Sequence, residues 1–113
     1  MKTIVVEKPW GKFQELTKSE STTVKILTIN PHHALSLQYH NHRSEFWKIL
    51  LGHPTVTIGD KVVVASPEEE FRIEVGKSHR LEAGDELVEV LEISYGDFDE
   101  NDIIRLEDKY GRA

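Results

Sequence analysis

Apolar and polar residues alternate with a period of two over much of this chain, which is the pattern of β-strands with one buried face. The alternation is clear in residues 23–29 (TVKILTI), 71–75 (FRIEV) and 87–93 (LVEVLEI), which include many β-branched side chains. Residues 55–64 (TVTIGDKVVV) hold two such runs around Gly59-Asp60, a pair typical of a hairpin turn. We therefore predict several short strands.

Two further strands are expected over residues 35–42 (LSLQYHNH) and 45–51 (EFWKILL), with a turn between them. A helical turn is expected only within residues 100–111 (ENDIIRLEDKYG), whose acidic start suits a helix N-terminus. Many short strands with frequent glycine and proline turns predict an all-β sandwich or barrel. The length of 113 residues fits a single domain over positions 1–113.

Composition narrows the class of protein. With 38% hydrophobic and 30% charged residues the chain is expected to be globular, and its apolar runs are too short to span a bilayer. The N-terminus lacks the apolar core of a signal peptide and there is no cysteine, so we expect a cytoplasmic protein without thiolate metal ligands. The net charge of -6 argues against nucleic acid or a membrane as partner, although a local group of arginines can bind a small anion.

One polar stretch interrupts the apolar pattern. On a strand over residues 35–42, Gln38, His40 and His42 share one face with Ser36. Polar side chains on the inner face of a small barrel are costly unless a partner satisfies them, and a divalent cation would do so.

Two residues further along the chain complete a ligand set. Glu45 opens the next predicted strand, and His79 follows Gly76, which permits a sharp bend. A mixed nitrogen and oxygen site suits zinc, manganese, iron, cobalt or nickel, and ligand type alone does not choose among them. The predicted ligands of one divalent metal ion are Gln38, His40, Glu45 and His79.

The other histidines and the tryptophans have simpler explanations. His32, His33 and His53 lie beside turn residues and are expected on the surface. Trp10 and Trp47 are expected in the core, and a cover over the barrel mouth is the alternative for the turn that holds Trp10.

Two spacings are similar to the motifs of cupins. The spacing QxHx4Ex6G, from Gln38 to Gly52, resembles the first cupin motif with glutamine in place of its first histidine. The spacing GxxH, from Gly76 to His79, resembles the end of the second motif. The segments KPWG, LSLQYHNHRSEFW, SHRLE and RLEDKYGR narrow the resemblance to the type II phosphomannose isomerase cupins. Such cupins form the C-terminal domain of bifunctional mannose-6-phosphate isomerase/mannose-1-phosphate guanylyltransferases, and some occur alone.

The resemblance implies a small barrel of two sheets, the jelly roll or double-stranded β-helix, with one metal ion in its mouth. It implies the four ligands named above, with His42 as the second choice if Gln38 is not bound. The implied activity is the metal-dependent interconversion of mannose 6-phosphate and fructose 6-phosphate, with His42 as candidate base and Arg43 at the site. By analogy with other cupins, a homodimer is expected.

The substrate of such an enzyme is a sugar phosphate, and arginine is well suited to its phosphate dianion. The alternative for each arginine is a surface ion pair with neighbouring acidic residues such as Glu82, Glu107 and Asp108. The candidates for the phosphate are Arg43, Arg80, Arg105 and Arg112.

One departure from the family pattern bears on the activity. The family commonly has histidine directly after the motif glutamate, and this chain has Phe46 there. If that histidine takes part in proton transfer, its loss favours a second interpretation, a cupin that binds a sugar phosphate without turnover. A different metal cupin enzyme, such as an oxygenase, is the third. Three other departures, at His32, Glu74 and Ala83, affect turn geometry more than chemistry.

Overall fold

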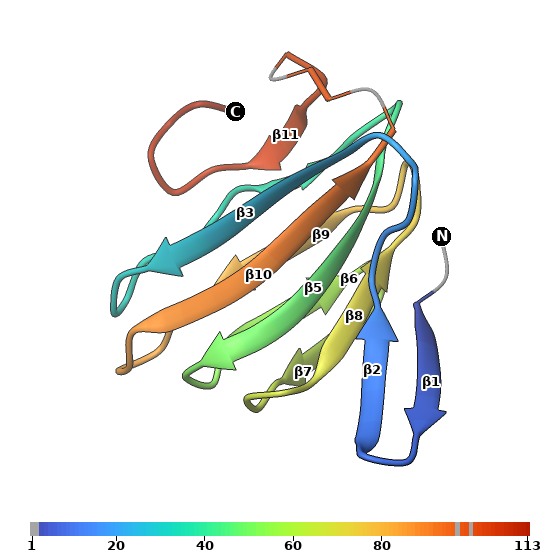
Figure 1. The fold of residues 1–113 in the computed structure, drawn as a ribbon. Helices are drawn as coiled ribbons and strands as arrows, with labels where there is room; N and C mark the ends of the chain where they lie inside the picture. Colours follow the sequence, from blue (N-terminus) through green and yellow to red (C-terminus); the bar gives the residue numbers. More distant parts are fainter. Residues whose placement is uncertain (1–2, 97, 100) are drawn as a thin grey trace.

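Strands of two facing sheets build the molecule, which we describe from a computed structural model covering residues 3–96, 98–99 and 101–113 (Figure 1). One sheet has the order β3-β10-β5-β8 and the other the order β11-β4-β9-β6-β7. The strands of the first sheet are β3 (Thr22–Ile29), β10 (Val88–Tyr95), β5 (Ser44–Leu51) and β8 (Glu70–Ile73). The strands of the second are β11 (Ile104–Glu107), β4 (Leu37–Tyr39), β9 (His79–Glu82), β6 (Thr55–Ile58) and β7 (Lys61–Val64).

The predicted all-β architecture is confirmed, and the hairpin around Gly59-Asp60 joins β6 to β7 as expected. All strand pairs described within both sheets are antiparallel. No helix among the described residues is long and apolar enough to cross a membrane.

Alternation along β5 sorts its side chains between two environments. Trp47 and Ile49 point between the sheets, where they join a buried apolar cluster with residues of both sheets. Phe46 points to the outer face of its sheet, where it packs with Ile93 and Tyr95 of β10 and with Leu16. A one-residue shift in register would exchange these faces, so the apolar pattern fixes the register of β5 and the placement of Glu45 with it.

The predicted strand over residues 35–42 is shorter than expected. The strand β4 ends at Tyr39, because the backbone N–H groups of Asn41 and His42 donate to the carboxylate of Asp102, at 2.8 and 2.9 Å, instead of pairing with a strand. The helical turn expected within residues 100–111 is wrong. Its central part is β11, which pairs with β4.

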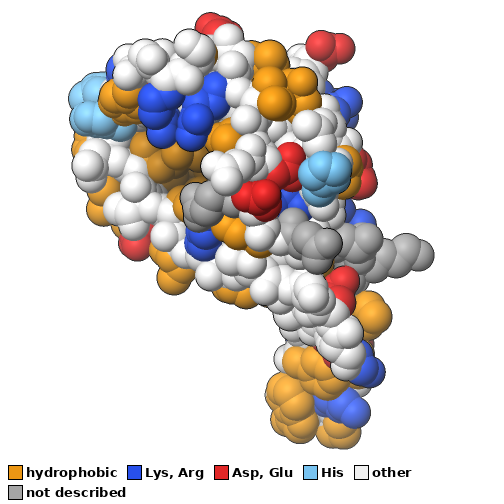
Figure 2. Space-filling model, turned by 90° about the horizontal axis from the view of Figure 1, so that it is seen from above, with side chains coloured by type: hydrophobic (Ala, Val, Ile, Leu, Met, Phe, Trp, Pro, Cys, Tyr) orange, Lys and Arg blue, Asp and Glu red, His pale blue; other side chains and the backbone are white. Residues whose placement is uncertain are grey.

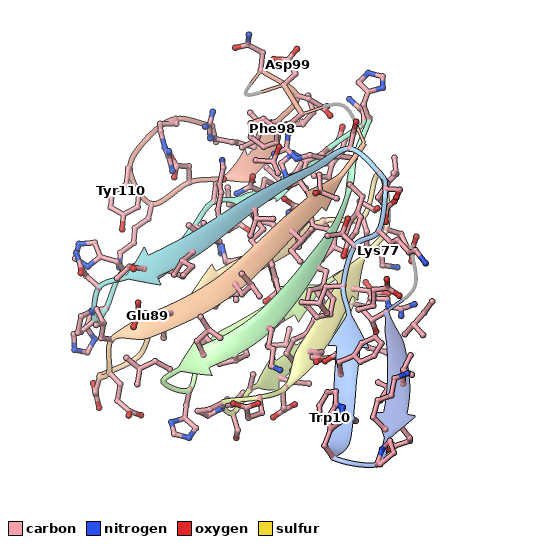
Figure 3. The ribbon with its side chains drawn as sticks, in the orientation of Figure 1. Trp10, Lys77, Glu89, Phe98, Asp99 and Tyr110 are labelled. Atoms are coloured by element: carbon pink, nitrogen blue, oxygen red, sulfur yellow. The ribbon has the colours of Figure 1, made fainter. Side chains whose placement is uncertain are left out.

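A hairpin of β1 (Ile4–Lys8) and β2 (Gly11–Glu15) was not predicted. It forms a two-stranded ribbon of its own that stands out from the two sheets (Figure 1). Figure 2 shows hydrophobic and basic side chains gathered at its end. Trp10 lies at the tip (Figure 3) and is 72% exposed, so its expected place in the core is wrong. Trp47 is fully buried, as predicted.

Candidate metal centre

Two histidines and one glutamate meet inside one end of the barrel. His40 follows β4, Glu45 lies near the start of β5, and His79 opens β9. All three side chains are buried, with at most 3% exposed. Oε1 of Glu45 lies 3.0 Å from Nε2 of His79 and 3.4 Å from Nε2 of His40. The fold therefore brings together three of the four predicted ligands.

The second nitrogen of each imidazole ring is held by the backbone. Nδ1 of His40 lies 2.6 Å from the carbonyl oxygen of Asp102, and Nδ1 of His79 lies 2.8 Å from that of Lys77. A carbonyl oxygen only accepts hydrogen bonds, so each Nδ1 carries a proton, and in the neutral ring the lone pair of Nε2 is then available to a metal ion. Arg43 donates to Nε2 of His40 at 3.3 Å, which agrees with this tautomer.

The carboxylate of Glu45 has one oriented oxygen and one that is left over. The hydroxyl of Ser94 donates to Oε2 at 3.1 Å, whereas Oε1 is buried and has no hydrogen-bond partner among the described residues. One possible ligand atom from each of His40, Glu45 and His79 lies within 4.8 Å of the other two. Such a donor set, with backbone carbonyls orienting the rings, fits one divalent metal ion.

The pKa values of two buried carboxyl groups of the site are shifted in opposite directions. Burial opposes ionisation of Glu45, but the close approach of the imidazole groups of His40 and His79 outweighs it and holds the pKa of Glu45 well below its ordinary value. Burial, and next the repulsion by Glu45, raises the pKa of Glu92. The indole N–H of Trp47 donates to Oε2 of Glu92 at 3.0 Å, which opposes that rise. Ionisation is thus favoured at Glu45 and made less favourable at Glu92.

A pocket of about 170 Å³ lies beside the two histidines and Glu45. Three basic side chains line it, those of Lys25, Arg43 and Arg105. The ring of Phe98 lies 4.4 Å from Nζ of Lys25 and 4.5 Å from Cζ of Arg43. Phe98 and Asp99 lie at one end of the barrel, on the segment before β11 (Figure 3). Positive charge beside a metal-type donor set suits an anionic ligand.

Three of the other predicted site residues also line this pocket. Gln38 pairs with His79 across neighbouring strands and lines the same pocket as the other three predicted ligands. Arg43 is buried, with Nε 3.6 Å from Oε2 of Glu45. The Nε of Arg105 is buried and has no hydrogen-bond partner among the described residues, which leaves it available to a bound anion.

The structure places three predicted site residues outside the pocket lining. The side chain of His42 is exposed, because the chain has left β4 and turns there. Arg80 alternates with His79 along β9 and donates to the carbonyl oxygens of Leu35 and Glu107. Arg112 forms an ion pair with Asp108 at 2.8 Å, as the surface alternative predicted. Their positions do not support the predicted roles.

The turn-flanking histidines lie on the surface, as expected. His32 and His53 are exposed and pair with Asp85 and Glu86, and His33 is exposed as well. Phe46 faces away from the metal centre, because it lies on the opposite face of β5 from Glu45 and is buried in the outer cluster.

Sequence reasoning missed Lys25, Glu92, Phe98 and Asp102. For two of them a signal was available. Glu92 continues the inward phase of Val88 and Val90, so it is a charged residue at a position that the strand pattern reserves for the core. Lys25 is likewise in phase with Leu27 on β3, and both line the pocket. Phe98 and Asp102 lie on an irregular segment without a periodic signal.

Comparison with known proteins identifies the family of the chain. Residues 2–108 match the family described as mannose-6-phosphate isomerase C-terminal. The mannose-1-phosphate guanylyltransferase ManC of Salmonella typhimurium is 36% identical over 96% of this chain and 23% of its own length. The xanthan biosynthesis protein XanB of Xanthomonas campestris pv. campestris is 38% identical, over 96% of this chain and 24% of its own. The chain thus spans about a quarter of the length of these relatives.

Solved structures agree with the fold. A cupin-2 domain protein of Rhodospirillum rubrum, Rru_A2000, superposes with a TM-score of 0.67 at 17% identity, over 88% of this chain and 72% of that one. The capsular polysaccharide assembling protein CapF of Staphylococcus aureus gives 0.68 at 19% identity, over 96% of this chain and 33% of that one. At these identities the likeness shows the fold, and the predicted cupin barrel is confirmed.

Proposed function

Because the chain belongs to the mannose-6-phosphate isomerase C-terminal family, we propose that it interconverts mannose 6-phosphate and fructose 6-phosphate with one divalent metal ion. The observation that carries the proposal is the buried arrangement of His40, Glu45 and His79, whose donor atoms converge beside a pocket with basic walls. Gln38 is the fourth proposed ligand, since it lines the same pocket.

The reaction moves hydrogen between two neighbouring carbons of the open-chain sugar without any co-reactant. A base takes the proton from C2 of the aldose, the electron pair forms the C1–C2 double bond of an enediol, and a proton is returned at C1. One hydroxyl proton moves from O2 to O1, so the balance closes within the substrate. A divalent metal ion, when bound, would polarise the carbonyl group and stabilise the developing oxyanion.

The residues of the pocket can supply the other two tasks. Arg43, Arg105 and Lys25 line it and would hold the phosphate dianion, which fixes the orientation of the sugar. Glu92 lines the pocket as a carboxyl outside the proposed ligand set, so we assign the proton transfer between C1 and C2 to it in place of His42.

The position of Phe46 weakens the case for a binding protein without turnover. That interpretation rested on the replacement of a family histidine, but the side chain at this position lies on the outer face of its sheet. Phe46 is therefore not one of the residues that line the pocket.

The test is a measurement of metal content and of mannose 6-phosphate turnover on one purified sample, for the wild type, Glu45→Ala and Glu74→Ala. Glu74 is exposed and serves as the matched control. We expect about one metal ion per chain and turnover in the wild type and the control, with both lost in Glu45→Ala. Metal without turnover would overturn the isomerase, and no metal after reconstitution would overturn the metal centre.

A further inference from the structure

Asp102 joins the segment before β11 to the loop that carries His40. It is 9% exposed, and its two carboxylate oxygens accept the backbone N–H groups of Asn41 and His42 at 2.8 and 2.9 Å. Its backbone carbonyl accepts Nδ1–H of His40 at 2.6 Å. Three hydrogen bonds from one residue therefore converge on three consecutive residues of this loop.

These contacts have different consequences for the imidazole. The carbonyl of Asp102 keeps a proton on Nδ1 of His40, because only an Nδ1–H can donate to it, and Nε2 is then the nitrogen that faces Glu45 and remains for a metal ion. The carboxylate fixes where that carbonyl stands, because it binds the loop on which the ring is carried. Without the carboxylate, the described links between the two segments would be the ring of His40 and the side chain of Arg43, which donates to the carbonyl oxygen of Asp99 at 3.1 Å and lies on the ring of Phe98.

The loop needs such an anchor because no strand supplies one. The strand β4 ends at Tyr39 and β5 begins at Ser44, so the N–H groups of Asn41 and His42 have no partner from a sheet ladder. If these N–H groups had no partner, the loop would adopt other backbone conformations in which they are paired. His40 would then no longer point toward the metal centre. Asp102 lowers this freedom, because its carboxylate oxygens accept both of these N–H groups.

We infer that Asp102 is a positioning residue that presets His40 as a metal ligand, in the Nδ1–H tautomer with Nε2 directed at the pocket. The part of this inference that concerns metal affinity rests on the proposed metal centre. The tautomer and the position of the ring are properties of the metal-free chain and are tested without it.

The test compares Asp102→Ala and Asp102→Asn with the wild type and with Asp108→Asn. The asparagine variant would keep one acceptor oxygen and the size of the side chain, whereas the alanine variant removes both acceptors. Asp108 is a matched control, since its carboxylate also accepts a backbone N–H, that of Arg112, but near the C-terminus and outside the pocket lining. The samples are full chains in a chelator, so all metal is removed before the first measurement.

The first readout is the ¹⁵N NMR spectrum of the His40 ring, which distinguishes the two tautomers. We expect one tautomer, protonated at Nδ1, in the wild type and in Asp108→Asn. A mixture is expected in Asp102→Ala, with Asp102→Asn between the two. An unchanged single Nδ1–H tautomer in Asp102→Ala would overturn the inference.

The second readout is zinc affinity, measured by competition with a chromophoric chelator. Loss of a residue that orients a ligand typically weakens metal binding by about 10- to 100-fold, and we expect this for Asp102→Ala and less for Asp102→Asn. Chemical unfolding in chelator is measured beside it, because a merely structural role would lower stability and leave the zinc affinity of the folded fraction unchanged. Should the wild type bind no zinc, the metal centre fails, and the tautomer measurement still decides the role of Asp102.

Discussion

The interior of the barrel has an apolar half and an ionisable half, and the same strands build both. Along β5 the inward side chains change from Glu45 to Trp47 and Ile49, and along β9 they change from His79 to Leu81. On β10 the change runs the other way, from two buried valines to Glu92 and Ser94. The two halves therefore lie on the same strands and are equally buried. They differ in the type of side chain, which is apolar in one half and ionisable or polar in the other.

This difference separates what the fold needs from what the site needs. Burial of the apolar half stabilises the fold, at roughly 25 cal/mol per Å² of apolar surface removed from water. Burial of the ionisable half costs free energy, which hydrogen bonds such as that from Ser94 to Glu45 offset only in part. An oxygen of Glu45 is left without a hydrogen-bond partner among the described residues. Stability alone gives no reason to bury such a group, whereas binding a cation does.

The largest expected loss of stability comes from the apolar half. Ile49→Ala would remove a fully buried side chain beside Trp47, and we expect the free energy of unfolding to fall by about 2–5 kcal/mol. Because Ile49 does not line the pocket, the zinc affinity of the folded fraction should stay within about threefold of the wild type. Urea unfolding and chelator competition on one sample check both. A large fall in zinc affinity would show that the two halves are not independent.

A second prediction compares the two faces of β5. Phe46→His restores the residue that the family commonly has, but in this structure it would place an imidazole in the outer apolar cluster. We expect the free energy of unfolding to fall by about 1–3 kcal/mol, because the ring nitrogens would be buried among apolar side chains. No gain in isomerase activity or zinc affinity is expected. A gain in activity would show that this position reaches the substrate after all. Phe46→Leu is the control for packing.

A third prediction concerns the arginines. Arg105 lines the pocket, and Arg112 is paired with Asp108 outside it. We expect Arg105→Ala to lower kcat/KM for mannose 6-phosphate by about tenfold, the loss of one charged hydrogen bond to the phosphate, which is about 1.4 kcal/mol. Arg112→Ala should change it by less than about threefold. Steady-state kinetics decide between them, and equal losses would contradict the assignment of the phosphate to the pocket.

The contrast between the two halves also explains which strands and which site residues the sequence predicts. Alternation predicted the strands, because a period of two is all that a half-buried strand requires. Motif spacing predicted His40, Glu45 and His79, since each lies on or directly beside a strand whose register is fixed by apolar neighbours. His42 and Trp10 were misplaced because they lie in turns, where side-chain direction does not follow the strand period. For His42, a hydrogen bond to a distant residue decides how the turn is built. That residue is Asp102, 60 positions away.

The smallest expected effect is the dependence of stability on Glu92. The pKa of Glu92 is raised in the folded protein. At a pH between the ordinary pKa of glutamate and this raised pKa, Glu92 keeps its proton in the folded state but has released it in the unfolded chain. The contribution of Glu92 to stability is therefore greatest at low pH and is lost as the pH rises through this window. Glu92→Gln keeps an acceptor for the indole of Trp47 and cannot ionise.

The free energy of unfolding of Glu92→Gln, relative to the wild type in chelator, should therefore rise with pH from about pH 4 upward and then level off. Urea unfolding at a series of pH values measures this difference. Glu89→Gln, on the same strand but outside the pocket lining, is the control and should show no such trend. A difference that stays flat with pH would mean that Glu92 ionises freely. The ionisable half would then carry no cost at this residue, and the contrast between the two halves would rest on Glu45 alone.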